Sequence, residues 1–301
     1  MVLRFAAGLA LTLIVAVAPA TAQTSATWAA VAANQYRVVP GITYLTAINW
    51  EAKLDVYTPT TPGPHPVVLH IHGGGWTGGS RESVVLRALP YLEMGVAVVN
   101  VSYRLARVSQ APAGVEDCRC ALRWILRNAK EYGFDVSRIV VTGYSAGAHL
   151  ALTTGMLTPA AGFDRQCPGN EDLKVAAIVN WFGIADVVDL LDGANMRVYA
   201  VEWLGSRPDR VEAARRVSPL TYVRKDLPPI LTIHGDADPT VPYQHATRLH
   251  AALQQAGASS ELVTIPAGRH GNFPPADQTR AVEAVRAFLA KHGITRRAPS
   301  N

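Results

Sequence analysis

Residues 139–152 read I-V-V-T-G-Y-S-A-G-A-H-L-A-L, and this stretch decides the fold of the chain. Its first four residues, Ile139 to Thr142, are apolar or β-branched and predict a buried strand, whereas the residues after Gly147 predict a helix. Between them lies the pattern G-x-S-x-G, which at a strand-to-helix turn lifts the serine hydroxyl above the edge of a sheet. The stretch therefore indicates that Ser145 is a nucleophile. A glycine-rich turn whose serine only caps the helix is the alternative.

Apolar runs alternate with helical patterns on both sides of this turn. After a hairpin at 42–56, strands are expected at 67–71, 96–101, 139–142, 175–181, 230–233 and 261–265. Helices are expected at 81–93, 113–132, 146–157, 243–255 and 276–291. This alternation predicts an α/β fold in which helices cover both faces of a mostly parallel sheet. Ligands of such sheets bind at the carboxyl ends of the strands.

A second glycine-rich stretch follows the expected strand 67–71. It reads His72-Gly73-Gly74-Gly75-Trp76, and consecutive glycines allow backbone N–H groups to converge on one point. Such donors stabilise the negative oxygen of a tetrahedral intermediate. A phosphate-binding loop is the alternative, but the G-x-x-x-x-G-K-[ST] pattern does not occur here. The stretch therefore predicts an oxyanion-hole loop.

A nucleophilic serine needs a histidine base, and that histidine needs a carboxylate to orient it. In enzymes with this type of serine turn the chain order is serine, acid, histidine. His270 lies in a glycine-bracketed loop after the expected strand 261–265, whereas the other downstream histidines lie on helices or before the expected acid. We therefore predict that His270 is the base.

The acid is expected after the strand 230–233, where the chain reads His234-Gly235-Asp236-Ala237-Asp238-Pro239. Asp236 and Asp238 both fall at the carboxyl end of the predicted sheet. One of them is expected to brace the turn, which is an ordinary role of aspartate in loops. The residues alone do not separate the two.

Together these motifs resemble the α/β-hydrolase superfamily, and within it the bifunctional feruloyl/acetyl-xylan esterases and the hormone-sensitive-lipase-like carboxylesterases. The resemblance covers residues 44–291, and its landmarks are HGGGW (72–76), SYRL (102–105), D-x-x-x-A-L-R-W (117–124), GYSAGAHLA (143–151), HGDADPTVP (234–242) and RHG (269–271). It implies the α/β-hydrolase fold and makes Asp238 the triad acid, with Asp236 structural. It also implies that Gly74, Gly75 and Ala146 donate the oxyanion-hole N–H groups.

The chain departs from the lipase-like pattern at two places. Ala106-Arg107-Val108 follows Tyr-Arg-Leu, where lipase-like members often continue with Ala-Pro-Glu. Few residues precede the first strand, so a large N-terminal cap has little room, and we expect an open site covered mainly by an inserted segment at 184–217. Trp76, Trp181 and Phe182 are candidates for the acyl-binding wall, with core packing as the alternative.

These features predict a secreted serine carboxylesterase that hydrolyses short-chain acyl esters through an acyl-enzyme. The expected substrate is a small-molecule or carbohydrate-linked ester. No cofactor is expected, and no metal, because His70 and His72 lack a recognisable set of further ligands. A peptidase or amidase of the prolyl-oligopeptidase type is one alternative, since the same triad cleaves amides. A non-catalytic binding protein on the same fold is another.

The first 22 residues have the pattern of a secretory signal peptide. Arg4 supplies a positive start, 5–18 an apolar stretch, and Ala20-Thr21-Ala22 a small-residue cleavage site. The apolar stretch is shorter than the roughly 20 residues that a membrane span requires. We expect cleavage after Ala22, no membrane anchor, and a single secreted or periplasmic domain over 23–301.

The composition fits a folded domain of this size. Of 301 residues, 49% are hydrophobic and 17% charged, which is enough apolar material for a large core. The net charge of +5 is not concentrated in a basic run, so nucleic-acid binding is not expected. The chain has three cysteines, and Cys120 with Cys167 is the favoured pairing in an oxidising compartment, with three free thiols as the alternative. Composition predicts no oligomeric state.

Overall fold

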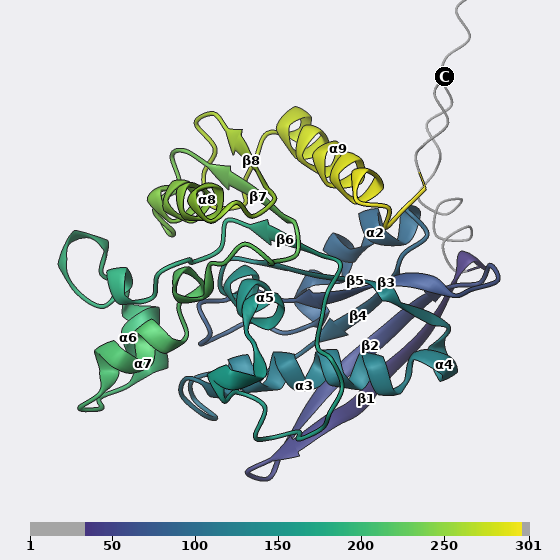
Figure 1. Cartoon of the computed structure of the whole chain (residues 1–301), viewed down its shortest axis with the longest axis horizontal. Coiled ribbons are helices and arrows are strands. Elements are labelled where there is room, and N and C mark those ends of the chain that lie inside the picture. The colour runs from purple at the N-terminus through teal and green to yellow at the C-terminus, as the bar shows by residue number, and fades with distance from the viewer. Residues whose placement is uncertain (1–33, 297–301) are drawn as a thin grey trace, which may run out of the picture.

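A computed structural model describes residues 34–296, and its centre is one sheet of eight strands flanked by helices (Figure 1). In the order in which they lie in the sheet, the strands are β1 (Tyr36–Ala47), β2 (Trp50–Pro59), β4 (Ala97–Val101), β3 (His65–Ile71), β5 (Phe134–Tyr144), β6 (Ala177–Trp181), β7 (Ile230–Gly235) and β8 (Ser260–Ile265). β1 and β2 pair antiparallel, as do β2 and β4, whereas every pairing from β4 to β8 is parallel. The expected mostly parallel α/β sheet is therefore confirmed.

The helices lie where the sequence predicts them, but two of the predicted helices are divided. Helices α5 (Ala146–Met156), α8 (Gln244–Ala256) and α9 (Pro275–Lys291) follow the predicted ranges closely. The predicted helix 113–132 breaks at Asn128 into α3 (Ala113–Arg127) and α4 (Ala129–Tyr132).

The predicted helix 81–93 is a 3₁₀ helix, η1 (Glu82–Ala88), followed by α2 (Leu89–Glu93). Pro90 lies in the first turn of α2, where its missing N–H would have no helical partner. A new helix therefore begins there.

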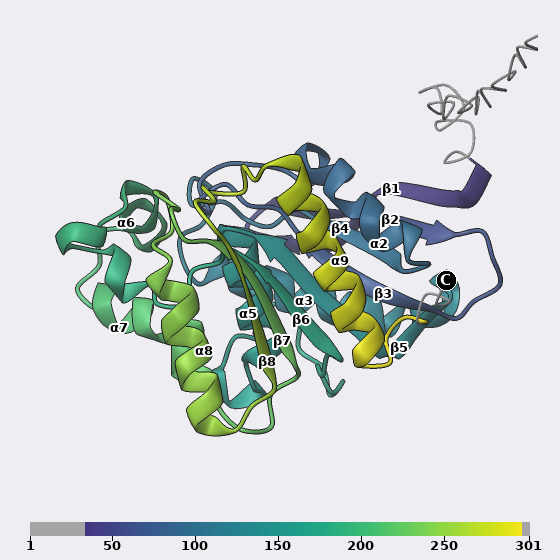
Figure 2. The ribbon, with the colours of Figure 1, turned by 90° about the horizontal axis from the view of Figure 1, so that it is seen from above.

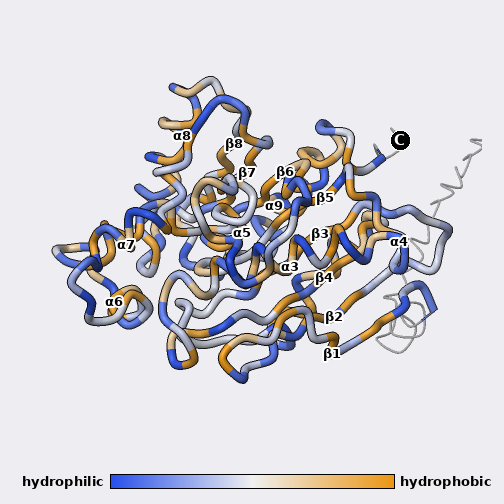
Figure 3. The backbone as a smooth tube through the Cα atoms, turned by 60° about the horizontal axis from the view of Figure 1, so that its bottom comes forward, coloured by the Kyte–Doolittle hydropathy of each residue, from blue (hydrophilic) through white to orange (hydrophobic). Residues whose placement is uncertain are grey.

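The core has two parts because side chains alternate across each strand. On β3, Val67, Leu69 and Ile71 join the core beneath α3 and α5, whereas Val68 joins the core beneath α2 and α9. The ribbon from above shows how these helices lie about the sheet (Figure 2), and hydrophobic residues recur along its central strands (Figure 3). Both faces of the central strands are thus buried, as continuous apolar runs predict.

The segment 184–217 lies between β6 and β7 and carries two short helices, α6 (Val198–Leu204) and α7 (Arg210–Arg216). Figure 1 shows them at the left edge of the molecule. A disulfide joins Cys120 on α3 to Cys167 in the loop that follows α5, and this confirms the favoured pairing. Cys118 is a buried free thiol.

Within residues 34–296, no helix is long and apolar enough to cross a membrane. The predicted signal peptide over 1–22 lies outside the described residues.

Candidate active site

Ser145 occupies a strained turn between β5 and α5. Its φ of 56° and ψ of −122° are sparsely populated by residues other than glycine, and its N–H donates to the carbonyl of Trp181 at 2.9 Å. A Cβ atom on Gly143 would overlap the backbone of Gly147, and one on Gly147 would overlap the carbonyl of Ile71. Both glycines of the G-x-S-x-G pattern are therefore required by close backbone packing, and the turn presents Ser145 at the carboxyl end of β5.

His270 and Asp238 form a hydrogen-bonded pair at the same edge of the sheet. The Nδ1 atom of His270 lies 2.7 Å from Oδ2 of Asp238. The other oxygen, Oδ1, accepts the backbone N–H groups of Thr240 at 2.8 Å and Val241 at 3.0 Å. Burial disfavours the ionised carboxylate, but hydrogen bonds from His234 and His270 outweigh burial and hold the pKa of Asp238 well below its usual range. Asp238 is therefore an ionised group aimed at His270.

Asp236 has a different position. Its side chain is exposed, and Oδ1 accepts the N–H of Ala267 at 2.7 Å, in the loop that leads to His270. Asp236 thus braces that loop, whereas Asp238 contacts the imidazole.

Ser145 and His270 line one cleft of about 250 Å³. The cleft is also lined by Gly73, Gly74, Gly79, Ser83, Val84, Arg87, Tyr144 and Phe182. Phe182 places its ring edge against His270, with ring centroids 4.7 Å apart. Ser145 and His270 therefore open into a common space, and none of the residues that line it is acidic.

The expected oxyanion loop borders this cleft. Gly74 and Gly75 have φ values of 113° and 59°, which residues with side chains rarely adopt. Gly74 and the neighbouring Gly73 line the cleft, whereas Gly75 and Ala146 are not among its lining residues. Within residues 34–296, no hydrogen bond engages the N–H groups of Gly74 and Gly75. The loop thus keeps unpaired donors beside Ser145.

Trp76 does not line the cleft, contrary to its place among the candidate wall residues. Its indole has no exposed surface and stacks on Trp203 of α6, with centroids 4.2 Å apart. Its Nε1–H donates to Nδ1 of His149 at 3.2 Å. The alternative of core packing is the observed one, because α6 covers the residue that follows the oxyanion loop. Of the other two candidates, Phe182 lines the cleft and Trp181 lines a cavity beside it.

That adjoining cavity has a volume of about 360 Å³. Tyr91, Tyr144 and Trp181 give it aromatic walls, and Tyr144 and Arg87 line the cleft as well. The guanidinium carbon of Arg87 lies 4.3 Å from the centroid of the Tyr144 ring. The sequence did not indicate Arg87, because it lies within the predicted helix 81–93 and belongs to no catalytic motif. Tyr144 could have been considered, since it directly precedes the serine.

The segment 184–217 does not contribute to the residues that line the cleft. Instead of covering the cleft, as expected for a cap, it packs beside the oxyanion loop through Trp203. In the described part of the chain, no three His, Cys, Asp or Glu side chains gather as they would around a metal ion.

Comparisons with known proteins agree with this geometry. The chain is 30% identical over 233 residues to esterase LipQ and 31% identical over 249 residues to the probable carboxylic ester hydrolase LipM, both of Mycobacterium tuberculosis. These matches cover 74% and 79% of this chain but 55% and 57% of the relatives, so the chain spans a little over half their length.

Solved structures match over more of their length. Native esterase 2 of Thermogutta terrifontis has a TM-score of 0.73 at 27% identity, with 88% of this chain and 95% of that chain covered. The same esterase has also been solved with propionate bound. A truncated carbohydrate esterase from gut microbiota has a TM-score of 0.74 at 26% identity, with 86% and 97% covered.

The fold and these relatives place the chain among the α/β-hydrolases, and the relatives themselves are esterases. A family model matches residues 54–253, and the chain accordingly belongs to the BD-FAE family.

Proposed function

We propose that the protein is a serine carboxylesterase that hydrolyses short-chain acyl esters, with Ser145, His270 and Asp238 as its catalytic triad. The observation that carries this proposal is the Asp238–His270 hydrogen bond of 2.7 Å in a cleft that the strained Ser145 turn also lines. The three groups follow the chain order serine, acid, histidine that this fold requires.

In the proposed reaction, Ser145 Oγ attacks the ester carbonyl while His270 Nε2 accepts the hydroxyl proton. Asp238 accepts the Nδ1–H of His270, which fixes the reactive tautomer and stabilises the imidazolium that forms. The N–H groups of Gly74, Gly75 and Ala146 would stabilise the negative oxygen of the tetrahedral intermediate. His270 then protonates the departing alcohol, and a water molecule that His270 deprotonates releases the acid and regenerates Ser145.

The preference for short acyl groups is supported by the small cleft of about 250 Å³ and by Trp76 and Trp203, which fill the space next to the oxyanion loop. The propionate found in esterase 2 of Thermogutta terrifontis agrees with this preference. Small-molecule and carbohydrate-linked esters are the proposed substrates, the latter because a carbohydrate esterase is among the structural relatives.

The test is hydrolysis of p-nitrophenyl esters of two to ten acyl carbons, beside p-nitroanilides, by purified protein. We expect kcat/KM to peak at two to four carbons and to fall by eight, with anilides far slower. A maximum at octanoate or longer would contradict the short acyl site, and faster anilide cleavage would favour the amidase alternative.

We also propose that the protein is exported. The sequence pattern over 1–22 supports this proposal, and so does the Cys120–Cys167 disulfide, since disulfides persist in oxidising compartments. Fractionation of cells that express the full chain, with N-terminal sequencing, is expected to give a mature protein that begins after Ala22. Recovery of uncleaved protein from the cytoplasm would contradict export.

A further inference from the structure

The start of α6 contacts two loops of the proposed active site at once. On one side, Arg197 Nε donates to the carbonyl of Thr240 at 2.9 Å and Arg197 Nη2 donates to that of Pro239 at 3.2 Å. The hydroxyl of Tyr199 donates to the carbonyl of Thr240 as well, at 3.2 Å. Burial raises the pKa of Tyr199 to about 12, so this hydroxyl keeps the proton that it donates.

The carbonyls that α6 binds belong to the same peptide groups that hold the triad acid. Each peptide group is planar and carries a C=O on one side and an N–H on the other. The Pro239 carbonyl shares a peptide group with the Thr240 N–H, and the Thr240 carbonyl shares one with the Val241 N–H. Those two N–H groups donate to Oδ1 of Asp238. Arg197 therefore binds the far side of both peptide groups that orient the carboxylate.

This arrangement also strengthens the hydrogen bonds to Asp238. A cation at a carbonyl polarises the peptide group, and its N–H becomes a better donor. Arg197 has no carboxylate partner among residues 34–296, so its charge is directed at these carbonyls and at that of Met196.

On its other side, α6 packs against the oxyanion loop. A Cβ atom on Gly75 would lie 2.9 Å from Cβ of Tyr199, so the Tyr199 side chain closes directly over this glycine. Trp203, one helical turn later, stacks on Trp76. One face of α6 thus packs against the loop that carries the proposed oxyanion donors.

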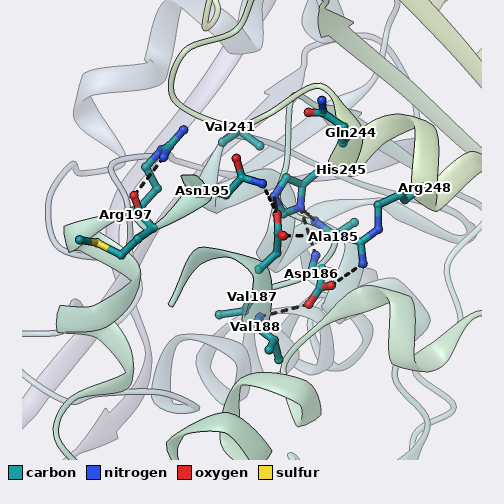
Figure 4. A network of polar contacts seen from close by, with 12 residues as sticks. Ala185, Asp186, Val187, Val188, Asn195, Arg197, Val241, Gln244, His245 and Arg248 are labelled. Carbon is teal, nitrogen blue, oxygen red and sulfur yellow. Dashed lines mark hydrogen bonds and ion pairs between the residues drawn. The ribbon is translucent and has the colours of Figure 1, made fainter. Parts of the chain in front are cut away.

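A polar network connects the inserted segment, before α6 begins, with helix α8 (Figure 4). Helix α8 directly follows the loop that carries Asp238. Arg248 pairs with Asp186 at 2.6 Å, and His245 accepts the N–H groups of Ala185 and Asp186 at 3.2 and 3.3 Å. Burial lowers the pKa of His245 to about 4, so its ring stays neutral and accepts these bonds near neutral pH. The start of the inserted segment is therefore fixed against α8, the helix that directly follows the loop of Asp238.

We propose that Arg197 and Tyr199 are positioning residues that set the Asp238 carboxylate and the Gly74–Gly75 turn relative to Ser145. This inference rests on the proposed function, because it assigns Asp238 and the glycine loop their catalytic roles. The inserted segment then acts as a brace of the active site.

The test is a double-mutant cycle of Arg197→Ala with Asp238→Asn, measured as kcat and KM for steady-state hydrolysis of p-nitrophenyl acetate. We expect Arg197→Ala alone to lower kcat at least tenfold with KM within twofold. In the Asp238→Asn background the same change should cost less than twofold, because the group through which Arg197 acts is already impaired. Arg215→Ala is the matched control, and its kcat should not change, since within residues 34–296 the Arg215 side chain pairs only with exposed Glu212 of the same segment.

Tyr199→Phe provides a second variant that keeps the packing on Gly75 and removes only the hydroxyl. It should melt within a few degrees of the parent and lower kcat several-fold, again only when Asp238 is intact. The inference is overturned if Arg197→Ala and Tyr199→Phe both retain kcat within twofold, or if the loss is equally large in the Asp238→Asn background. A parent protein that does not hydrolyse the ester at all would overturn the proposed function instead.

Discussion

The two faces of the sheet differ in how they are packed near Ser145. On the face beneath α3 and α5, Trp76 and Trp203 stack with no exposed surface and fill the space beside the oxyanion loop. On the face beneath α2 and α9, Tyr144 and Trp181 border an open cavity of about 360 Å³ that adjoins the cleft. We call these the filled flank and the open flank. The filled flank positions the loops, and the open flank leaves room for a substrate.

The polar groups of the two flanks support the same distinction. On the filled flank, His149 accepts from Trp76 and its Nε2 lies 2.7 Å from the carbonyl of Val217. Burial lowers the pKa of His149 to about 3, so this imidazole stays neutral and serves packing. On the open flank, Arg87 is exposed and has no carboxylate partner in the described part of the chain. Arg87 is therefore available to a charged group of an ester bound at the open flank.

The largest expected effect concerns Asp238, the proposed triad acid. Asp238→Asn should lower kcat about 10⁴-fold, because an amide would hold the wrong tautomer of His270. Asp236→Asn should cost less than tenfold, because its oxygen can still accept the N–H of Ala267. Steady-state hydrolysis of p-nitrophenyl acetate measures both changes, and equal losses would remove the distinction between the two aspartates.

A smaller effect is expected from truncation on the filled flank. Trp203→Ala should lower the free energy of unfolding by about 3–5 kcal/mol, since it leaves a large cavity against Trp76. Val282→Ala, which enlarges the cavity of the open flank, should cost under about 1.5 kcal/mol because Val282 is only partly buried. Urea denaturation of both variants tests the comparison. Similar costs would show that the two flanks are packed alike.

The smallest expected effect concerns charge at the open flank. Arg87→Gln should lower kcat/KM about fivefold for 4-acetoxybenzoate, whose leaving group is anionic, because an exposed arginine–carboxylate contact contributes on the order of 1 kcal/mol. For the neutral analogue 4-acetoxybenzamide the loss should stay below twofold. If kcat/KM falls equally for both substrates, Arg87 does not distinguish a charged leaving group from a neutral one, and the open flank is not the leaving-group side.

Local patterns predicted the parts of this site that depend on neighbours in the chain. The turn at Ser145 and its flanking glycines could be predicted because one strand–turn–helix stretch contains the whole G-x-S-x-G motif. His270 followed from chain order and from its place in a loop. The strands were predicted well because burial on both faces requires continuous apolar runs, which are visible in the residues themselves.

Contacts between distant segments could not be predicted in the same way. Asp236 and Asp238 stand two residues apart in one loop, and only the position of His270 separates their roles. Trp76 follows the oxyanion loop and suggested an acyl wall, but Trp203 from the inserted segment covers it. Likewise, nothing near Arg197 indicates that it binds the acid loop. These roles arise from tertiary packing, which sequence periodicity does not encode.

Covalent labelling tests whether Ser145 is the nucleophile of an ester hydrolase. Purified protein is treated with a p-nitrophenyl phosphonate ester, and the released p-nitrophenol and the modified peptide are quantified by absorbance and mass spectrometry. We expect one equivalent of phosphonate on Ser145, complete loss of esterase activity, and no label on the folded Ser145→Ala variant. Stoichiometric labelling of another residue, or esterase activity that survives complete modification of Ser145, would show that Ser145 is not the nucleophile.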